Sequence, residues 1–341
     1  MCKEMPPREL VNRTLEFDSP SRIPFDRDHG IEKWGMTNMK TVVDAIQQDF
    51  PNDMTWISGE YLQPPPLTYG EPQECGIYID DWGCTFENIF DGIIGEVKQP
   101  MVAVWADLDK VRPPDARHSL DRAKVNEVCR GTDLFTRAGC CARPFERAQF
   151  LRGTENVLMD FYESPDELRA LLDIIHQHYL KEIEVWSETE VDAIVFMDDW
   201  GTQKSLLIDP ELWRKWFLPY YADYCDVAKS RGKKVFMHSC GNILQILPDL
   251  IAIGVDAVNA QVATMGLDNV EPFSGKLTFW GGLDRQNTLY SGSAEDVRHE
   301  VREFMAKLWR NGGVIAMNYL EPQTNPENVY VAFDEWFKYQ L

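Results

Sequence analysis

The chain has 341 residues, of which 44% are hydrophobic and 26% are charged, a composition typical of a globular protein with a sizeable core. Its 34 Lys and Arg against 55 Asp and Glu give a formal net charge of −21, which argues against binding to nucleic acids or to anionic membranes. No apolar run reaches the roughly 20 residues that a membrane span needs. No signal-peptide core follows Met1, so we expect a cytoplasmic protein whose eight cysteines are reduced thiols.

The first third of the chain mixes several kinds of pattern. Helices are expected over 7–17 and 41–50, and strands over 22–25 and 54–58. Alternating residues and glycine turns between 76 and 104 indicate a β-rich insertion that occupies about residues 60–105. A helix interrupted at Pro113-Pro114 is expected over 108–128.

From residue 134 onward, strands and helices alternate regularly. The expected strands are 134–140, 192–198, 234–238, 256–259, 277–282 and 313–318, and the expected helices are 155–162, 165–189, 210–231, 244–253, 294–311 and 325–339. Such alternation implies right-handed crossovers and a parallel sheet. Eight strands in all predict a (β/α)8 TIM barrel over residues 1–341 as a single domain, with the insertion after the second strand. A doubly wound open sheet is the alternative, but the chain has no Gly-x-Gly-x-x-Gly segment.

The apolar run that begins at Val235 ends on His238-Ser239-Cys240-Gly241. On an extended segment, His238 and Cys240 point to the same face. An imidazole beside a thiolate can supply two ligands to a metal ion, and zinc is the metal that this pair fits best. The alternative is a buried histidine beside an inert cysteine, and a zinc site needs a third ligand from elsewhere.

Polar residues also follow the other late strands, where a TIM barrel places its active site. The residues expected there are Asp198, Asp199, Trp200 and Gln203, then Asn259, then Trp280 and Asp284, and finally Asn318, Tyr319 and Glu321. Adjacent carboxylates on a strand face opposite ways, so Asp198 or Asp199, with Gln203, is predicted to accept or orient a substrate proton. Capping of the following helix is the alternative for these two acids.

Several of these segments together resemble the uroporphyrinogen decarboxylase superfamily. The segments that carry the resemblance are Asp80–Gly83, Asp198–Gln203, Ile208–Trp213, Leu218–Tyr220, His238–Gly241, Gly281–Asp284 and Gly312–Ile315. The resemblance covers most of the chain and implies a TIM barrel. The superfamily contains decarboxylases of heme synthesis and methyltransferases that work with corrinoid proteins.

Two features make the chain more similar to the methyltransferases. The decarboxylases carry Arg-Gln-Ala-Gly-Arg after the first strand, whereas residues 25–30 read Phe-Asp-Arg-Asp-His-Gly, and one Arg between two Asp is a poor anion clamp. The methyltransferases carry a zinc motif of His-x-Cys, matched by His238 and Cys240, and a distant Cys after the last strand. This chain has Asn318-Tyr319-Leu320-Glu321 in that region, so Glu321 is expected as the third ligand, with a fourth position open for substrate.

The resemblance implies a zinc-dependent methyltransferase that moves a methyl group between a small substrate and the cobalt of a corrinoid protein. An oxygen ligand makes zinc a harder Lewis acid, which favours a methoxylated aromatic donor, with methanol and methylamine as further candidates. The expected catalytic residues are Asp198, Asp199, Gln203 and Tyr319, and the expected substrate-binding residues are Trp82, Trp200, Asn259, Trp280, Asp284 and Asn318. Packing in the core is the alternative for the aromatic residues.

Two other functions stay open at this point. A decarboxylase acting on a porphyrinogen or another carboxylic acid would need a cationic pocket, to which Arg137 and Arg143 could contribute. A barrel that binds a ligand without catalysing a reaction is the second alternative. Because the corrinoid-binding pattern Asp-x-His-x-x-Gly is absent, the corrinoid is expected on a separate protein. Both a monomer and a homodimer are compatible with the sequence.

Overall fold

A parallel sheet forms the centre of the computed structural model, which describes residues 5–31 and 33–339. Its strands lie in the order in which the chain forms them: β1 Met54–Ile57, β5 Phe135–Ala142, β6 Ala193–Met197, β7 Lys234–Ser239, β8 Ala257–Ala260, β9 Thr278–Trp280 and β10 Val314–Ile315. The register of these strands pairs His238 on β7 with Met197 on β6 and with Asn259 on β8. The C-terminal ends of neighbouring strands therefore bring their following residues together.

The predicted first strand, 22–25, links the two edges of this sheet but is reduced to isolated bridge residues, among them Phe25, which forms a parallel bridge with Ala316. On its other side, the backbone N–H of Asp53 donates to the carbonyl of Phe25 at 2.8 Å. Pro24 has no N–H to donate, which limits the length of this strand. The predicted TIM-type α/β fold is confirmed.

The β-rich insertion after the second strand is also confirmed. It contains the antiparallel strands β2 Gly76–Ile79, β3 Thr85–Asn88 and β4 Glu96–Val97. The first two pair from Ile79 opposite Thr85 to Gly76 opposite Asn88. The loop after β3, which contains Gly92 to Gly95, reaches the open end of the barrel, where it lines a cavity described below.

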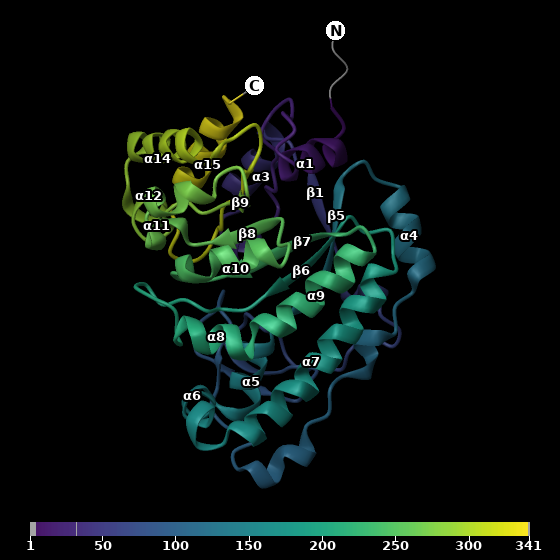
Figure 1. Cartoon of the computed structure of the whole chain (residues 1–341). Helices are drawn as coiled ribbons and strands as arrows, with labels where there is room; N and C mark the ends of the chain where they lie inside the picture. The colour runs from purple at the N-terminus through teal and green to yellow at the C-terminus, as the bar shows by residue number, and fades with distance from the viewer. Residues whose placement is uncertain (1–4, 32, 340–341) are drawn as a thin grey trace.

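Helices pack around the sheet, and one of them, α1, packs Val11 and Leu15 against the side chains inside the barrel. They are α1 Pro7–Leu15, α2 Lys33–Asn38, α3 Lys40–Asp49, α4 Arg122–Arg130, α5 Pro144–Arg152, α6 Thr154–Glu163, α7 Pro165–Ser187, α8 Pro210–Trp216, α9 Leu218–Ser230, α10 Leu247–Ala252, α11 Val262–Met265, α12 Leu267–Val270, α13 Thr288–Ser291, α14 Ala294–Leu308 and α15 Pro326–Phe337. Figure 1 shows α7 and α9 side by side on one side of the strands, with α14 and α15 on the other side near the C-terminus. None of the helices in the described part of the chain has both the length and the apolarity that crossing a membrane requires.

Prolines account for two differences from the predicted helices. The helix expected over 210–231 is two helices, because the chain turns at Phe217 and restarts with Pro219 in the first turn of α9. The helix expected over 108–128 is wrong for most of its length. Two short 3-10 helices, Trp105–Lys110 and Asp115–His118, flank Pro113-Pro114, and only α4 is α-helical.

The core has two parts, because successive strand side chains point alternately into the barrel and toward the helices. Inside the barrel, Arg137 and Asp26 form a fully buried ion pair with N–O distances of 2.6 and 2.8 Å. The indole of Trp280 donates to the same carboxylate at 2.8 Å. Arg137 is therefore held inside the barrel by this ion pair.

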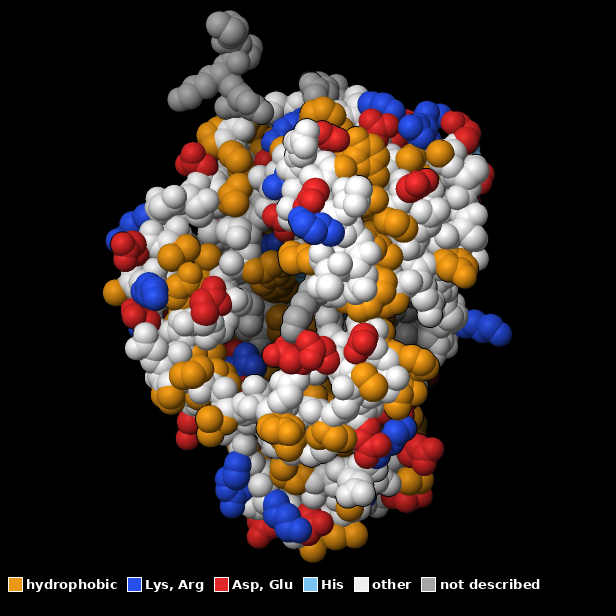
Figure 2. All heavy atoms as spheres, turned by 180° about the vertical axis from the view of Figure 1, so that it is seen from behind, with side chains coloured by type: hydrophobic (Ala, Val, Ile, Leu, Met, Phe, Trp, Pro, Cys, Tyr) orange, Lys and Arg blue, Asp and Glu red, His pale blue; other side chains and the backbone are white. Residues whose placement is uncertain are grey.

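On the surface view in Figure 2, acidic and basic side chains are interspersed with exposed hydrophobic ones.

Candidate active site

His238 and Cys240 lie at the C-terminal end of β7 with their metal-binding atoms toward each other. The Nε2 atom of His238 is 3.4 Å from the Sγ atom of Cys240 and 3.5 Å from an Oδ1 oxygen of Asp199. Ligand atoms of these three residues all lie within 4.8 Å of one another, the one such group in the described part of the chain. Two ligands of a tetrahedral zinc ion are separated by roughly 3.4–3.6 Å, so the spacing fits zinc.

The loop after β6 carries Asp199 to this position because two glycines let it approach the loop after β7. A Cβ atom on Gly201 would lie 2.3 Å from the backbone nitrogen of Asn242, and one on Gly241 would lie 2.1 Å from the carbonyl oxygen of Gly201. The backbone N–H of Cys240 donates to Asp199 Oδ1 at 2.8 Å. Larger residues at either glycine would push the carboxylate away from the thiol.

The side chain of Asn259 determines which nitrogen of His238 is free. Its Nδ2 donates to the carbonyl of Trp280, which can only accept, so its Oδ1 must face His238. That oxygen also accepts a hydrogen bond from the hydroxyl of Tyr319 at 2.9 Å. His238 Nδ1 therefore carries the proton that Asn259 accepts, and Nε2 is left for a metal.

The electrostatics of this group favour a cation. Burial acts to raise the pKa of Asp199, but hydrogen bonds from His238 and from Cys240 outweigh burial and lower the pKa to about 2. Burial acts to lower the pKa of His238, but Tyr319, Asp199 and Cys240 outweigh it and hold the pKa well above its usual value. Surroundings that favour a proton on Nε2 also favour a metal cation there.

Glu321, the expected third ligand, is not part of this group. Arg285 lies between it and the thiol, since Nη1 is 3.0 Å from Glu321 Oε1 and Nη2 is 3.4 Å from Cys240 Sγ. The structure thus brings Asp199, from the neighbouring strand, to the place where the sequence predicted Glu321. Arg285 directly follows Asp284, so a reading of every polar residue after the seventh predicted strand would have included it.

Asp198, the other predicted catalytic acid, makes buried hydrogen bonds that stabilise the fold. It is fully buried, and its carboxylate accepts the backbone N–H groups of Phe145 and Glu146 at 2.7 and 2.8 Å and the hydroxyl of Tyr221 at 2.7 Å. It thereby holds the N-terminus of α5, which precedes it in the chain, and not that of the following helix as the capping alternative had it. Gln203 is exposed in the following loop.

The structure does not bring the predicted substrate-binding residues together in one place. Asn259 lies against His238, while Trp200 and Trp280 are buried in the core, where their indole N–H groups donate to Tyr221 and Asp26. Asp284 accepts the backbone N–H groups of Gln286 and Asn287, so it shapes its own loop.

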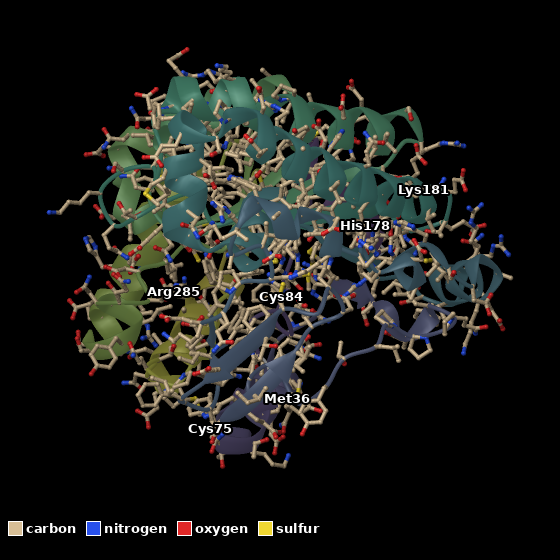
Figure 3. All side chains as sticks on the ribbon, turned by 90° about the horizontal axis from the view of Figure 1, so that it is seen from below. Met36, Cys75, Cys84, His178, Lys181 and Arg285 are labelled. Atoms are coloured by element: carbon tan, nitrogen blue, oxygen red, sulfur yellow. The ribbon has the colours of Figure 1, made fainter. Side chains whose placement is uncertain are left out.

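Asn318 and Trp82 belong to two different cavities. The side-chain amide of Asn318 is buried and has no hydrogen-bond partner among the described residues, and it lines a small cavity of about 30 Å³ next to His238. Trp82 lines a separate cavity beneath the insertion, in contact with His178 and Arg147. In Figure 3, Arg285 lies beside the C-terminal part of the chain, and His178 lies on the other side of Cys84.

A cavity of about 380 Å³ opens beside the metal-binding group. Asp199, Tyr319 and Glu321 line it on the barrel side. Apolar side chains form much of the rest of its wall, namely Trp34, Ile93, Ile94, Phe150, Met197, Leu320 and Pro322. The polar side chains of Gln73, Arg143 and Glu146 line it as well. A small molecule in this cavity would have its polar end at Asp199 and an apolar surface around its body.

Two enzymes are similar to this chain over part of its length. The methylcobamide:CoM methyltransferase MtbA of Methanosarcina mazei is 24% identical over 205 residues, which cover 56% of this chain and 56% of that enzyme. The enzyme of the same name from Methanosarcina acetivorans is 26% identical over 220 residues, which cover 60% of this chain and 62% of that enzyme. The matched region thus spans a little over half the length of either enzyme.

The fold is also that of a solved structure, a methyltransferase from Methanosarcina mazei. The TM-score is 0.67 at 17% sequence identity, and the match covers 99% of this chain and 100% of that one. At this identity the likeness concerns the fold. Residues 77–338 match the family model described as uroporphyrinogen decarboxylase (URO-D). Since this match extends over most of the sequence, the chain belongs to the uroporphyrinogen decarboxylase family.

Proposed function

We propose that this chain is a metal-dependent methyltransferase that moves a methyl group between a small substrate and the cobalt of a corrinoid protein. The observation that carries this proposal is the convergence of Asp199, His238 and Cys240 beside a cavity that can hold a small molecule. The likeness to two methylcobamide:CoM methyltransferases supports the reaction class.

In this proposal Asp199, His238 and Cys240 hold zinc, and Asp199 replaces Glu321 in the predicted ligand set. Zinc bound there would act as a Lewis acid on the heteroatom that carries or receives the methyl group. His238 Nδ1 keeps its proton and donates it in a hydrogen bond to Asn259 Oδ1, so the ring keeps its orientation. Tyr319 holds the same amide oxygen from the side of the cavity.

The ligand set bears on the substrate. A site with one thiolate, one imidazole and one carboxylate is harder than a site with two thiolates, which favours an oxygen-bearing methyl donor such as a methoxylated aromatic. The apolar side chains in the wall of the cavity can pack against the aromatic ring of such a donor, and Trp34 and Phe150 contribute rings to this wall.

A decarboxylase is the less favoured function, because two of the three arginines considered for its cationic pocket, Arg137 and Arg27, are engaged elsewhere. Arg137 is paired with Asp26 inside the barrel, and Arg27 donates to the backbone carbonyls of Gln47 and Phe50. Arg143 alone of the arginines considered for that role stays available, which does not suffice for a substrate with many carboxylates.

The test combines metal analysis with methyl transfer. Purified protein should contain zinc, and with a methoxylated aromatic and cob(I)alamin, free or bound to a corrinoid protein, it should form methylcobalamin, followed by its absorption spectrum. His238→Ala and Cys240→Ala should lose zinc and transfer together. Zinc without methyl transfer in either direction, from donors to cobalt or from methylcobalamin to thiols, would leave a ligand-binding barrel. Turnover of a porphyrinogen would establish the decarboxylase instead.

A further inference from the structure

Arg143, at the start of α5, is a cation that makes no ion pair with a carboxylate of the described residues. Its guanidinium donates to the backbone carbonyl of Cys141 at 3.5 Å, and its Nη2 contacts the sulfur of Met197 at 2.9 Å. Burial acts to lower the pKa of Arg143, but acidic groups nearby, Glu146 first, keep it above its usual value. The side chain is therefore charged, and its strongest hydrogen-bonding positions face weak acceptors.

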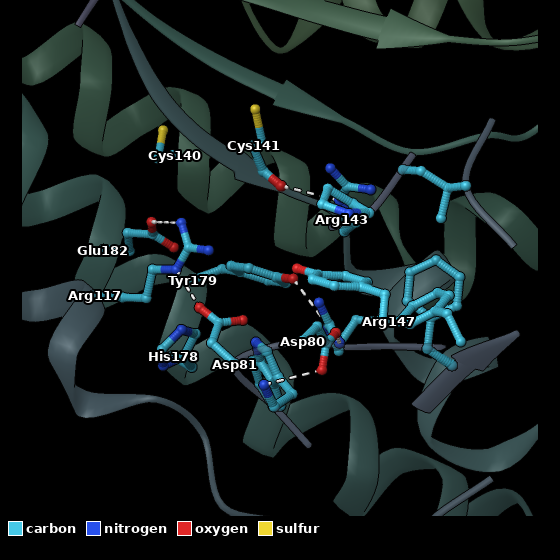
Figure 4. Close-up of a pocket in the computed structure, with 16 residues that line it drawn as sticks. Asp80, Asp81, Arg117, Cys140, Cys141, Arg143, Arg147, His178, Tyr179 and Glu182 are labelled. Carbon is cyan, nitrogen blue, oxygen red and sulfur yellow. Dashed lines mark hydrogen bonds and ion pairs between the residues drawn. The ribbon is translucent and has the colours of Figure 1, made fainter. Parts of the chain in front are cut away.

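Arg143 lines the cavity beneath the insertion, and the two other arginines of that cavity are paired with carboxylates. Arg117 is 2.6 Å from Asp81 and 3.8 Å from Glu182, and Arg147 is hydrogen-bonded to Asp80. Figure 4 shows these links as dashed lines, whereas Arg143 is joined only to the backbone oxygen of Cys141. Two acids of the cavity, Asp80 and Asp81, are thus already engaged by its other cations.

Glu182, a third acid in the wall of this cavity, does not offset the charge of Arg143. Burial raises its pKa to about 8, with the neighbouring arginines opposing the rise. At neutral pH the carboxyl is therefore mostly uncharged, so it does not balance a third arginine. The cavity, of about 170 Å³, keeps an excess of positive charge.

Arg143 also lines the larger cavity beside the metal-binding group. The two cavities share Arg143, Ile94 and Phe150 in their walls, so they lie next to each other on the two sides of these side chains. Asp199 and Tyr319 line the larger one. A single small molecule can therefore contact Arg143 at one end and reach the metal-binding group at the other.

We propose that Arg143 binds the anionic group of the substrate, which is then a small organic acid with one carboxylate or sulfonate and an apolar body. One unpaired guanidinium matches one such group, and a planar guanidinium in a partly buried site binds a carboxylate bidentately. The heteroatom that exchanges the methyl group lies at the opposite end, toward Asp199. This inference rests on the proposed function for the identity of that heteroatom, but the anion site itself does not.

The test compares acids with their neutral amides in direct binding. Titration calorimetry with zinc-loaded protein should give at least about 10-fold tighter binding of 4-methoxybenzoate than of 4-methoxybenzamide, since a buried charge-assisted pair contributes this much. The pair 3-mercaptopropionate and 3-mercaptopropanamide serves as a second comparison with a thiol. Arg143→Gln should remove the preference, and Arg143→Lys should restore part of it.

Arg112 provides the matched control, because it is an exposed arginine outside both cavities that donates to backbone carbonyls. Arg112→Gln should keep the preference for acids, and thermal unfolding should show that all three variants are folded. Equal binding of acid and amide in both pairs, or an unchanged preference in Arg143→Gln, would overturn the inference.

Failure of the proposed function would look different. If acids bind through Arg143 but no methyl transfer to or from cobalt occurs, the anion site stands and the reaction does not. If methyl transfer proceeds equally well with the acid and the amide and is unchanged in Arg143→Gln, the reaction stands and the role of Arg143 is refuted.

Discussion

The amide of Asn259 turns its oxygen toward Nδ1 of His238, because its nitrogen is held by the carbonyl of Trp280. Residues on adjacent strands thereby fix both the ring orientation and the tautomer of a metal-binding histidine. Zinc affinity and the stability of the fold should therefore change when these side chains are replaced.

Replacing Asn259 with Leu should weaken zinc binding by about 10- to 100-fold, the range found when an outer partner of a metal-binding histidine is removed. Zinc affinity can be measured by competition with a chromogenic chelator. Asn156→Ala is a suitable control, since Asn156, on α6, donates to the carbonyl of Arg152 at the end of α5 and lies outside the metal-binding group. Equal zinc affinity in Asn259→Leu and the control would show that His238 does not bind metal through Nε2.

Asp199→Asn and Glu321→Gln distinguish the two carboxylates as ligands. Each change removes a negative charge and keeps the shape of the side chain. Zinc content, measured by atomic emission, should fall well below one per chain in Asp199→Asn and stay close to that of the wild type in Glu321→Gln. The opposite result would make Glu321 the third ligand, as the sequence predicted, and would require Arg285 to move.

Asp198→Ala should destabilise the fold without a direct loss of metal ligands. The change leaves two buried backbone N–H groups of α5 and the Tyr221 hydroxyl without their acceptor. Denaturant unfolding should show a loss of about 3 kcal/mol or more. The exposed cap Asp209, which accepts from Glu211 at 2.8 Å, is the comparison, because Asp209→Ala should cost only about 1 kcal/mol. Similar losses in the two variants would contradict this role of Asp198.

Glu182→Gln should flatten the pH dependence of stability between about pH 5 and 8. Burial raises the pKa of Glu182 to about 8 in the folded protein, from an ordinary value of 4.5. Between these values the folded state binds more protons than the unfolded state, so stability falls as pH rises, by up to about 1.4 kcal/mol per unit. Urea unfolding of wild type and variant at several pH values gives both slopes, and identical slopes would show that Glu182 is ionised throughout.

Much of the fold follows from local order in the sequence. Apolar strands that alternate with helical segments predict a parallel sheet, and the glycine-rich alternation over 76–104 predicts the insertion. Where the prediction erred, at 108–128 and at 22–25, prolines shortened the elements. The effect of a proline depends on which hydrogen bonds its neighbours offer, and those come from segments far away in the chain.

The sequence alone determined that His238 and Cys240 share a face, because a spacing of two on an extended strand permits nothing else. It also determined that Asp198 and Asp199 face opposite ways. The tertiary structure decided which of the two acids reaches the metal-binding group. The N-terminus of α5, more than 40 residues earlier, engages Asp198, and the close approach of Gly201 to Gly241 carries Asp199 to Cys240. Likewise, only packing placed Arg285 between Glu321 and the thiol, since ion pairs between distant strands depend on side-chain positions that no local pattern specifies.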